Sequence, residues 1–115
     1  MELTKNDTGD VRVITVGDDR IDAAVAIQFK DKMRDLSEGA PGRIILDMTN
    51  VDFLDSSGLG AVVAVMKQIS ASRSFELAGL TTNVRKVFSL TRMDTVFTIH
   101  ADAQTALGGG LASAS

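Results

Sequence analysis

The segment Asp-Ser-Ser-Gly-Leu-Gly at residues 55–60 joins two strongly apolar stretches of different character. Residues 44–47 before it form a short run of the kind found in a central parallel strand. Residues 57–70 after it fit a helix that is apolar nearly all round until Lys67, which predicts that the helix is largely buried. Two serine hydroxyls are therefore expected at a helix N-terminus, where free backbone N–H groups and the helix dipole favour a negatively charged group.

The apolar periodicity of the rest of the chain predicts alternating strands and helices. Strands are expected at residues 11–16, 44–47, 75–78 and 95–99, with a further short strand around Leu3. Helices are expected at residues 23–37 with Asp22 as N-cap, at 57–70, from a cap at Thr82 or Asn83 to residue 90 or 91, and at 102–107. The predicted order is β-β-α-β-α-β-α-β-α, which makes the fold class α/β, with a mixed sheet of about five strands flanked by about four helices. We expect one small domain over residues 1–107 and a flexible C-terminal tail over residues 108–115, which begins with three glycines.

Composition argues against several classes of function. The 115 residues carry a net charge of −3 and only five aromatic side chains, all Phe, so nucleic-acid binding is not expected. The chain has no Cys and a single His, His100, so neither disulfides nor a metal site is expected. No apolar run approaches the ~20 residues of a membrane span, and the first residues lack the apolar core of a signal peptide. We therefore expect a cytoplasmic protein that does not associate with membranes.

Two chemical alternatives lack a group that they require. A serine nucleophile at Ser56 or Ser57 needs a base, but the only His is expected at a strand end and no G-x-S-x-G elbow surrounds either serine. A two-component receiver domain has acidic residues at strand ends, as Asp18 and Asp47 are here, but it also needs a Lys at the end of its last strand, where this chain has His100. No phosphate-binding loop or dinucleotide fingerprint is present. We expect a binding protein with no enzymatic activity and no cofactor.

The stretch from Asp47 to Ile69 resembles the signature of the STAS domain family, and within it most closely the bacterial anti-sigma factor antagonists. That signature is an apolar strand ending in Asp, a short turn, an aromatic residue, Met or Leu, then Asp-Ser-Ser/Thr-Gly-Leu-Gly and an apolar helix. The matching residues in this chain are 44–47, 51–54 and 55–60. The resemblance covers roughly residues 11–107 and implies a small mixed sheet flanked by helices, in agreement with the predicted order.

The resemblance implies a switch in signal transduction and transcription regulation. In the family, a cognate kinase phosphorylates the serine that directly follows the Asp, and in this chain that serine is Ser56. A non-enzymatic regulator of this kind binds an anti-sigma factor-type serine kinase while the serine is unmodified and releases it after phosphorylation. A PP2C-type phosphatase then resets the switch, and ATP belongs to the kinase. We expect a bacterial phosphoprotein that is a monomer or weak dimer.

A second stretch, residues 20–24, resembles the Gly-Glu-Leu-Asp element of the family, with Asp22 as the matching acid. In the family this loop lies beside the phosphorylation site and joins the partner surface. Asp19 stands where the family usually has Gly, which tolerates backbone angles that Asp adopts only at a cost. The expected partner-binding residues are Asp22, Ala23, Asp55, Ser56, Ser57, Gly58 and Leu59.

A phosphate at Ser56 adds roughly −1.5 to −2 charges beside Asp22, Asp52 and Asp55. An unpaired buried charge costs ~3–5 kcal/mol, enough to change affinity by two to three orders of magnitude. Two alternatives remain for this segment. One is that a serine hydroxyl only caps the helix, and the other is that the chain is a scaffold or ligand-sensing STAS module without a phospho-switch.

Overall fold

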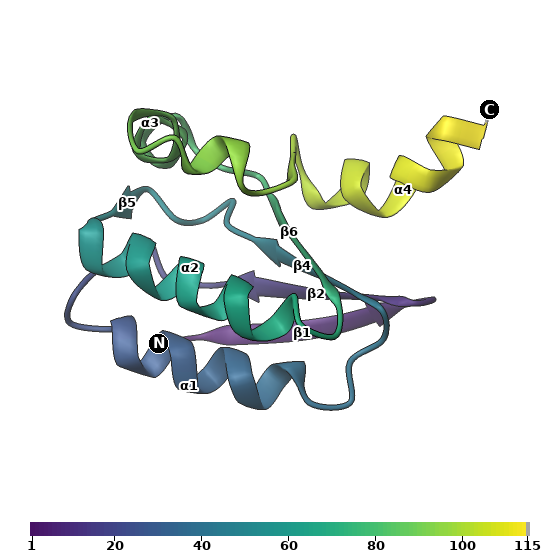
Figure 1. Cartoon of the computed structure of the whole chain (residues 1–115), viewed down its shortest axis with the longest axis horizontal. Coiled ribbons are helices and arrows are strands. Elements are labelled where there is room, and N and C mark those ends of the chain that lie inside the picture. The colour runs from purple at the N-terminus through teal and green to yellow at the C-terminus, as the bar shows by residue number, and fades with distance from the viewer. Residues whose placement is uncertain (115) are drawn as a thin grey trace.

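The computed structural model describes the backbone of residues 1–114 and the side chains of residues 1–108. At its centre lies a five-stranded sheet in the order β1-β2-β4-β6-β7. Figure 1 labels the first four of these strands. The strands are β1 (Leu3–Thr8), β2 (Val11–Val16), β4 (Arg43–Asp47), β6 (Ser74–Ala78) and β7 (Ile99–His100). β1 and β2 are antiparallel and the other neighbouring pairs are parallel, which confirms the predicted mixed sheet.

Helices cover both faces of this sheet. Within residues 1–114 the α-helices are α1 (Ala26–Ser37), α2 (Ser56–Ile69), α3 (Thr82–Leu90) and α4 (Ala103–Ala114), as many as predicted. Ile44 and Leu46 point into the larger core, which the sheet shares with α1, α2 and α3. Ile45, between them, points to the opposite face, where it packs with Ala106 of α4. β4 is therefore buried on both faces, as its continuous apolar run predicts.

The buried carboxylate of Glu76, on β6, organises the polar contacts beneath α4. Arg43 donates to it from Nε to Oε2 at 2.9 Å and from Nη2 to Oε1 at 2.6 Å, and Ser74 Oγ donates to Oε2 at 2.7 Å. His100 Nε2 lies 2.8 Å from Oε1, so this side chain, which is at a strand end as predicted, is paired with a carboxylate. Arg43 Nη2 also donates to the carbonyl of Ala106 at 3.3 Å, which ties α4 to the sheet.

The hydrogen bonds from Arg43, with smaller contributions from Ser74 and His100, lower the pKa of Glu76 to about 2 from 4.5. A carboxylate with a depressed pKa contributes stability that is fully present above the unfolded pKa and is lost as the pH falls toward the folded pKa. Between about pH 5 and pH 2.5, we therefore expect the free energy of unfolding to fall by about 2 kcal/mol more in the wild type than in Glu76→Gln. Urea unfolding at a series of pH values measures how the free energy of unfolding of each protein depends on pH. The same pH dependence in both proteins would contradict the lowered pKa of Glu76.

The strand predicted at residues 95–99 is wrong in most of its length. Residues Met93–Thr95 form a 3₁₀-helix, η1, and only Ile99–His100 pair with β6. Phe97 packs edge-to-face against Phe88, with ring centres 5.6 Å apart, and against Phe75 at 6.3 Å. To bury this ring between two others, the chain turns inward where the sequence pattern predicts that it extends.

The N-cap of α3 also differs from the prediction. Thr81 is the cap, with its hydroxyl accepting from the backbone N–H of Val84 at 3.4 Å. The same hydroxyl donates to the carbonyl of Val51 at 2.9 Å. The start of α3 is thereby attached to the segment that leads into the serine pair.

The terminal helix is longer than the predicted residues 102–107, because α4 continues to Ala114 through the glycine run. Gly disfavours a helix by about 1 kcal/mol relative to Ala, so the helix continues here against the local propensity. Ser115 lies outside the described residues. The division into a domain over 1–107 and a flexible tail over 108–115 stays a prediction.

Candidate functional site

The start of α2 is capped by a carboxylate and not by a serine. Asp55 is the N-cap: its Oδ1 accepts from the backbone N–H of Gly58 at 2.8 Å, and its carbonyl accepts from the N–H of Leu59 at 2.9 Å. Ser56 and Ser57 are the first two residues of the helix, and both are exposed. Among the hydrogen bonds of the described residues, neither serine hydroxyl takes part in one. The helix is thus capped without them, and both hydroxyls face solvent.

The same carboxylate holds the loop that precedes α1. Asp55 Oδ2 accepts from the backbone N–H of Ala23 at 3.2 Å. Asp22 is not the cap of a helix, because α1 begins only at Ala26; its Oδ1 instead accepts from the N–H of Ala24 at 3.1 Å and closes a tight turn. Asp55 therefore joins the two stretches that the sequence singled out, although they are 32 residues apart.

Two very short strands, which the sequence did not predict, position this loop. β3 (Arg20–Ile21) pairs in parallel with β5 (Phe53–Leu54) as a separate two-stranded sheet. Gly58 is buried beneath β3, and a Cβ on it would overlap the carbonyl oxygen of Ile21 and lie 2.8 Å from the carbonyl carbon. Gly58, one of the predicted partner-binding residues, is buried, and it allows α2 to pack closely on β3.

Asp19 adopts an ordinary backbone conformation, without the left-handed angles that Gly tolerates better. Among the described residues, Arg92 is the one non-glycine residue with a positive φ. The carbonyl of Asp19 accepts from the N–H groups of Asp52 at 2.8 Å and Phe53 at 3.2 Å. Asp19 therefore helps to hold β5 in place without backbone strain.

Arg20 and Phe53 are surface residues of the site that the sequence analysis did not select. Arg20 Nε lies 3.2 Å from Asp22 Oδ2, and its Cζ lies 5.0 Å from the centre of the Phe53 ring. The Phe53 side chain is 46% exposed, whereas Leu54 beside it is buried. The sequence could have indicated that one of these two apolar residues is exposed, because adjacent residues of a strand point to opposite faces.

The site is strongly acidic. Residues 18–22 and 52–55 contain five aspartates and one arginine, a formal charge of −4. The aspartates are Asp18, Asp19, Asp22, Asp52 and Asp55. Asp52 Oδ1 accepts from Asn83 Nδ2 of α3 at 3.1 Å, so the acidic surface borders α3. Any partner that docks on this face meets a local excess of negative charge.

The double role of Asp55 can be separated by substitution. Asp55→Ala is expected to lower the free energy of unfolding by about 1 kcal/mol through loss of the cap. Asp55→Asn keeps one acceptor oxygen for the N–H of Gly58, so we expect nearly normal stability but faster hydrogen exchange at the N–H of Ala23. Hydrogen exchange followed by two-dimensional NMR measures the backbone amides of Gly58 and Ala23, and Asp52→Asn is the matched control. Unchanged exchange at Ala23 in Asp55→Asn would contradict this assignment.

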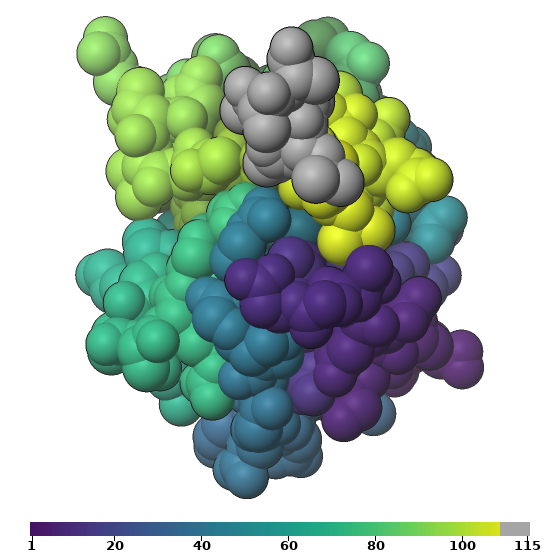
Figure 2. All heavy atoms as spheres, turned by 90° about the vertical axis from the view of Figure 1, so that its right-hand side faces the viewer, coloured from purple at the N-terminus to yellow at the C-terminus, as the bar shows by residue number. Residues whose placement is uncertain are grey.

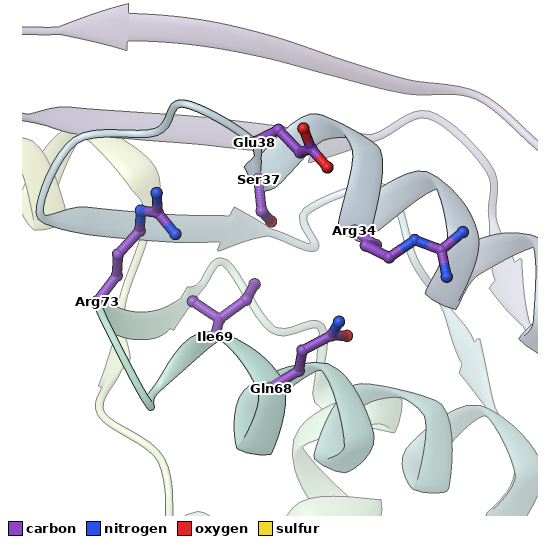
Figure 3. Close-up of a pocket in the computed structure, with 6 residues that line it drawn as sticks. All are labelled: Arg34, Ser37, Glu38, Gln68, Ile69 and Arg73. Atoms are coloured by element: carbon purple, nitrogen blue, oxygen red, sulfur yellow. The ribbon is translucent and has the colours of Figure 1, made fainter.

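A cleft of about 140 Å³ lies between the C-terminal ends of α1 and α2 (Figure 3). The 14-residue length of α2 places it about 20 Å from Ser56. It is lined by Arg34, Ser37, Glu38, Gln68, Ile69 and Arg73, none of which belongs to the predicted site. Within the described part of the chain no group of three or more acidic, His or Cys side chains is arranged to hold a metal ion, and no helix is long and apolar enough to cross a membrane.

The fold and this strand–loop–helix site define the class of protein to which the chain belongs. It is a small α/β module in which a capped helix presents two serines beside a loop from another part of the chain. The model of the STAS domain matches residues 2–106, and the chain belongs to the STAS domain family.

The chain is also similar to several individual proteins, in sequence or in fold. The chain is 28% identical over 112 residues to the anti-sigma-F factor antagonist RsfB of Mycobacterium tuberculosis, covering 94% of this chain and 90% of the relative. It is 29% identical over 102 residues to the anti-sigma-B factor antagonist of Listeria monocytogenes, covering 86% of each. The fold is also that of the anti-sigma factor antagonist SpoIIAA, solved in an unphosphorylated form (TM-score 0.74, 23% identity, 96% and 97% coverage) and, from Bacillus, in a phosphorylated form (TM-score 0.66, 24% identity, 92% and 96% coverage).

Proposed function

We propose that this chain is an anti-sigma factor antagonist that works by partner switching. With Ser56 unmodified, the face formed by the start of α2 and the loop at residues 22–24 binds an anti-sigma factor-type serine kinase and sequesters it from its client. Phosphorylation of Ser56 ends this binding, and a PP2C-type phosphatase restores it. The relatives named as anti-sigma factor antagonists support the proposal.

The single observation that carries the proposal is that Asp55, and not Ser56, caps α2. Because the carboxylate of Asp55 caps α2, the hydroxyl of Ser56 is not needed as a cap, and Ser56 is exposed. A kinase can modify it without breaking a contact of the fold. The N-terminal end of a helix also stabilises a phosphate, so the modified protein is expected to stay folded.

The phosphate acts on the complex and not on the fold. The site already carries a formal charge of −4, and phosphorylation adds roughly −1.5 to −2 more. A partner surface that fits a neutral hydroxyl would bury this charge without a counterion, at a cost of ~3–5 kcal/mol. Affinity then falls by two to three orders of magnitude without a large rearrangement.

Each site residue has a distinct part in the proposal. Ser56 is the acceptor, Asp22 and Ala23 form the adjoining loop, and Asp55 holds that loop to the helix. Exposed Ser57 and half-buried Leu59 extend the contact surface. In this proposal the chain is a regulator and not an enzyme, and the nucleotide belongs to the kinase.

The experiment is phosphorylation in vitro by the anti-sigma-type kinase encoded nearest to this gene, with ATP, followed by peptide mapping in a mass spectrometer. We expect one phosphate per chain, on Ser56, with uptake lost in Ser56→Ala and kept in Ser57→Ala. A chain that forms stable oligomers and takes up no phosphate on Ser56 would instead be a scaffold or ligand-sensing module. Phosphate on Ser57 alone would also overturn the assignment.

A further inference from the structure

β1 is an edge strand of the five-stranded sheet. It is the first strand in the sheet order, with β2 as its one neighbour, and Figure 2 shows the N-terminal strands, in purple, at one side of the molecule. From Thr4 to Thr8 every residue is exposed. β1 contains no Pro, and its register with β2 runs from Leu3 to Thr8 without a bulge. It therefore lacks two of the devices by which proteins block an edge strand.

The pairing with β2 determines which backbone groups of β1 point away from the sheet. The N–H of Gly17 donates to the carbonyl of Glu2 at 2.8 Å, in register with the β1–β2 ladder. Residues bonded to the neighbouring strand alternate along an antiparallel ladder, so the even-numbered residues of β1 bond to β2 and the odd-numbered ones direct their N–H and C=O groups outward. The outward residues are Leu3, Lys5 and Asp7. Among the described residues no backbone group pairs with these outward groups.

The sequence of β1 is self-complementary about Asn6. Residues 4–8 read Thr-Lys-Asn-Asp-Thr, so a threonine lies at each end and opposite charges lie on either side of Asn6. Lys5 and Asp7 lie on the same face of the sheet, because they are two residues apart. The Asp7 side chain is 49% exposed and accepts from Arg12 at 2.6 and 2.9 Å. A carboxylate has about four acceptor positions, so this one can accept from a lysine as well.

We propose that β1 pairs with β1 of a second copy of this chain, antiparallel about a twofold axis that passes between the two Asn6 residues. In this register Lys5 of each copy lies opposite Asp7 of the other. Both residues direct their backbone groups outward, so each such pair can exchange N–H···O=C hydrogen bonds in both directions. The two sheets then form one continuous sheet through the dimer.

Charge distinguishes this register from its neighbours. An axis at Lys5 places two lysines opposite each other, and an axis at Asp7 places two aspartates opposite each other, and like charges directly opposite destabilise a sheet. An axis at Asn6 places opposite charges together in both pairs. One strand therefore supplies both halves of a complementary surface, as a twofold contact requires. Backbone hydrogen bonds and exposed ion pairs bury little apolar surface, so the dimer is weak.

Hydrogen exchange of the full chain, followed by NMR at low and high protein concentration, tests this pairing. We expect the amides of Lys5 and Asp7 to become protected as the concentration rises, whereas those of Thr4 and Asn6, which already bond to β2, are protected throughout. Sedimentation equilibrium on the same samples measures the monomer–dimer equilibrium. A chain that stays monomeric up to about 1 mM would overturn the proposal. So would a dimer in which the amides of Lys5 and Asp7 exchange as they do in the monomer.

Two substitutions of Lys5 test the backbone and the charge contributions. Lys5→Pro removes an N–H that points outward and keeps the bonds to β2, so the monomer is expected to stay folded while the dissociation constant of the dimer rises at least tenfold. Lys5→Asp places like charges opposite each other and is expected to weaken the dimer to a similar degree. Circular dichroism checks that each variant is folded.

The matched control is Lys86→Asp, which makes the same change in net charge at an exposed residue of α3. It is expected to leave the dissociation constant within about twofold of the wild type. A dimer that survives both substitutions of Lys5, or one that Lys86→Asp weakens as much as Lys5→Asp does, would overturn the proposal.

Discussion

Gly58→Ala is expected to lower the free energy of unfolding by about 2 kcal/mol, even though Ala favours a helix over Gly by about 1 kcal/mol. Gly58 lies in the first turn of α2, where a Cβ would overlap the carbonyl oxygen of Ile21 and lie 2.8 Å from Leu54 Cδ1. The first of these atoms is backbone, so β3 or the helix start must shift to make room. Thermal and urea unfolding measure the loss.

Gly60→Ala is the matched control for Gly58→Ala, because both glycines lie in the same helix. A Cβ on Gly60 would meet nothing within 4 Å. Its replacement is therefore expected to be neutral or to stabilise the fold by up to about 1 kcal/mol. The close packing of α2 on β3 would be contradicted if Gly58→Ala were as stable as Gly60→Ala.

Ser56→Asp is expected to weaken binding to the cognate kinase by at least about 100-fold, whereas Ser56→Ala is expected to bind as the wild type does. The Ala variant removes a hydroxyl that makes no hydrogen bond within the described structure, so little changes. The Asp variant adds a charge to a face whose formal charge is already −4. Isothermal titration calorimetry with the purified kinase measures the affinities.

Ser72→Asp provides the control for net charge in that experiment. Ser72 is exposed and lies beyond the C-terminal end of α2, far from the proposed contact surface. Its substitution is expected to leave the affinity within about twofold of the wild type. If Ser56→Asp and Ser72→Asp weakened binding equally, long-range repulsion and not a local event at Ser56 would control the complex.

The strand and helix on either side of residues 55–60 could be predicted because their signals are local. β4 has three consecutive apolar residues at its centre that are buried on both faces of the sheet, and α2 has a clear start at Asp55. The mixed sheet followed from the order of such elements. The resemblance to a known family predicts Ser56 as the phosphorylated residue.

The parts that could not be predicted depend on contacts between distant segments. β3 and β5 have two residues each and exist only because they pair with one another across about 30 residues of chain. Asp22 has the side chain of a helix cap, but the Asp55 carboxylate holds the N–H of Ala23 outside the helix. Phe97 lies outside the predicted strand because its ring packs against the rings of Phe75 and Phe88.

The most direct test of the account uses the phosphorylated protein itself. Chain phosphorylated on Ser56 and unmodified chain, from one preparation, are titrated into the kinase by calorimetry, and a third sample is first treated with the PP2C-type phosphatase. We predict that phosphorylation weakens binding by two to three orders of magnitude and that the phosphatase restores it fully. Equal affinities for the phosphorylated and unmodified chains would contradict the claim that the charge on Ser56 decides whether the two proteins bind.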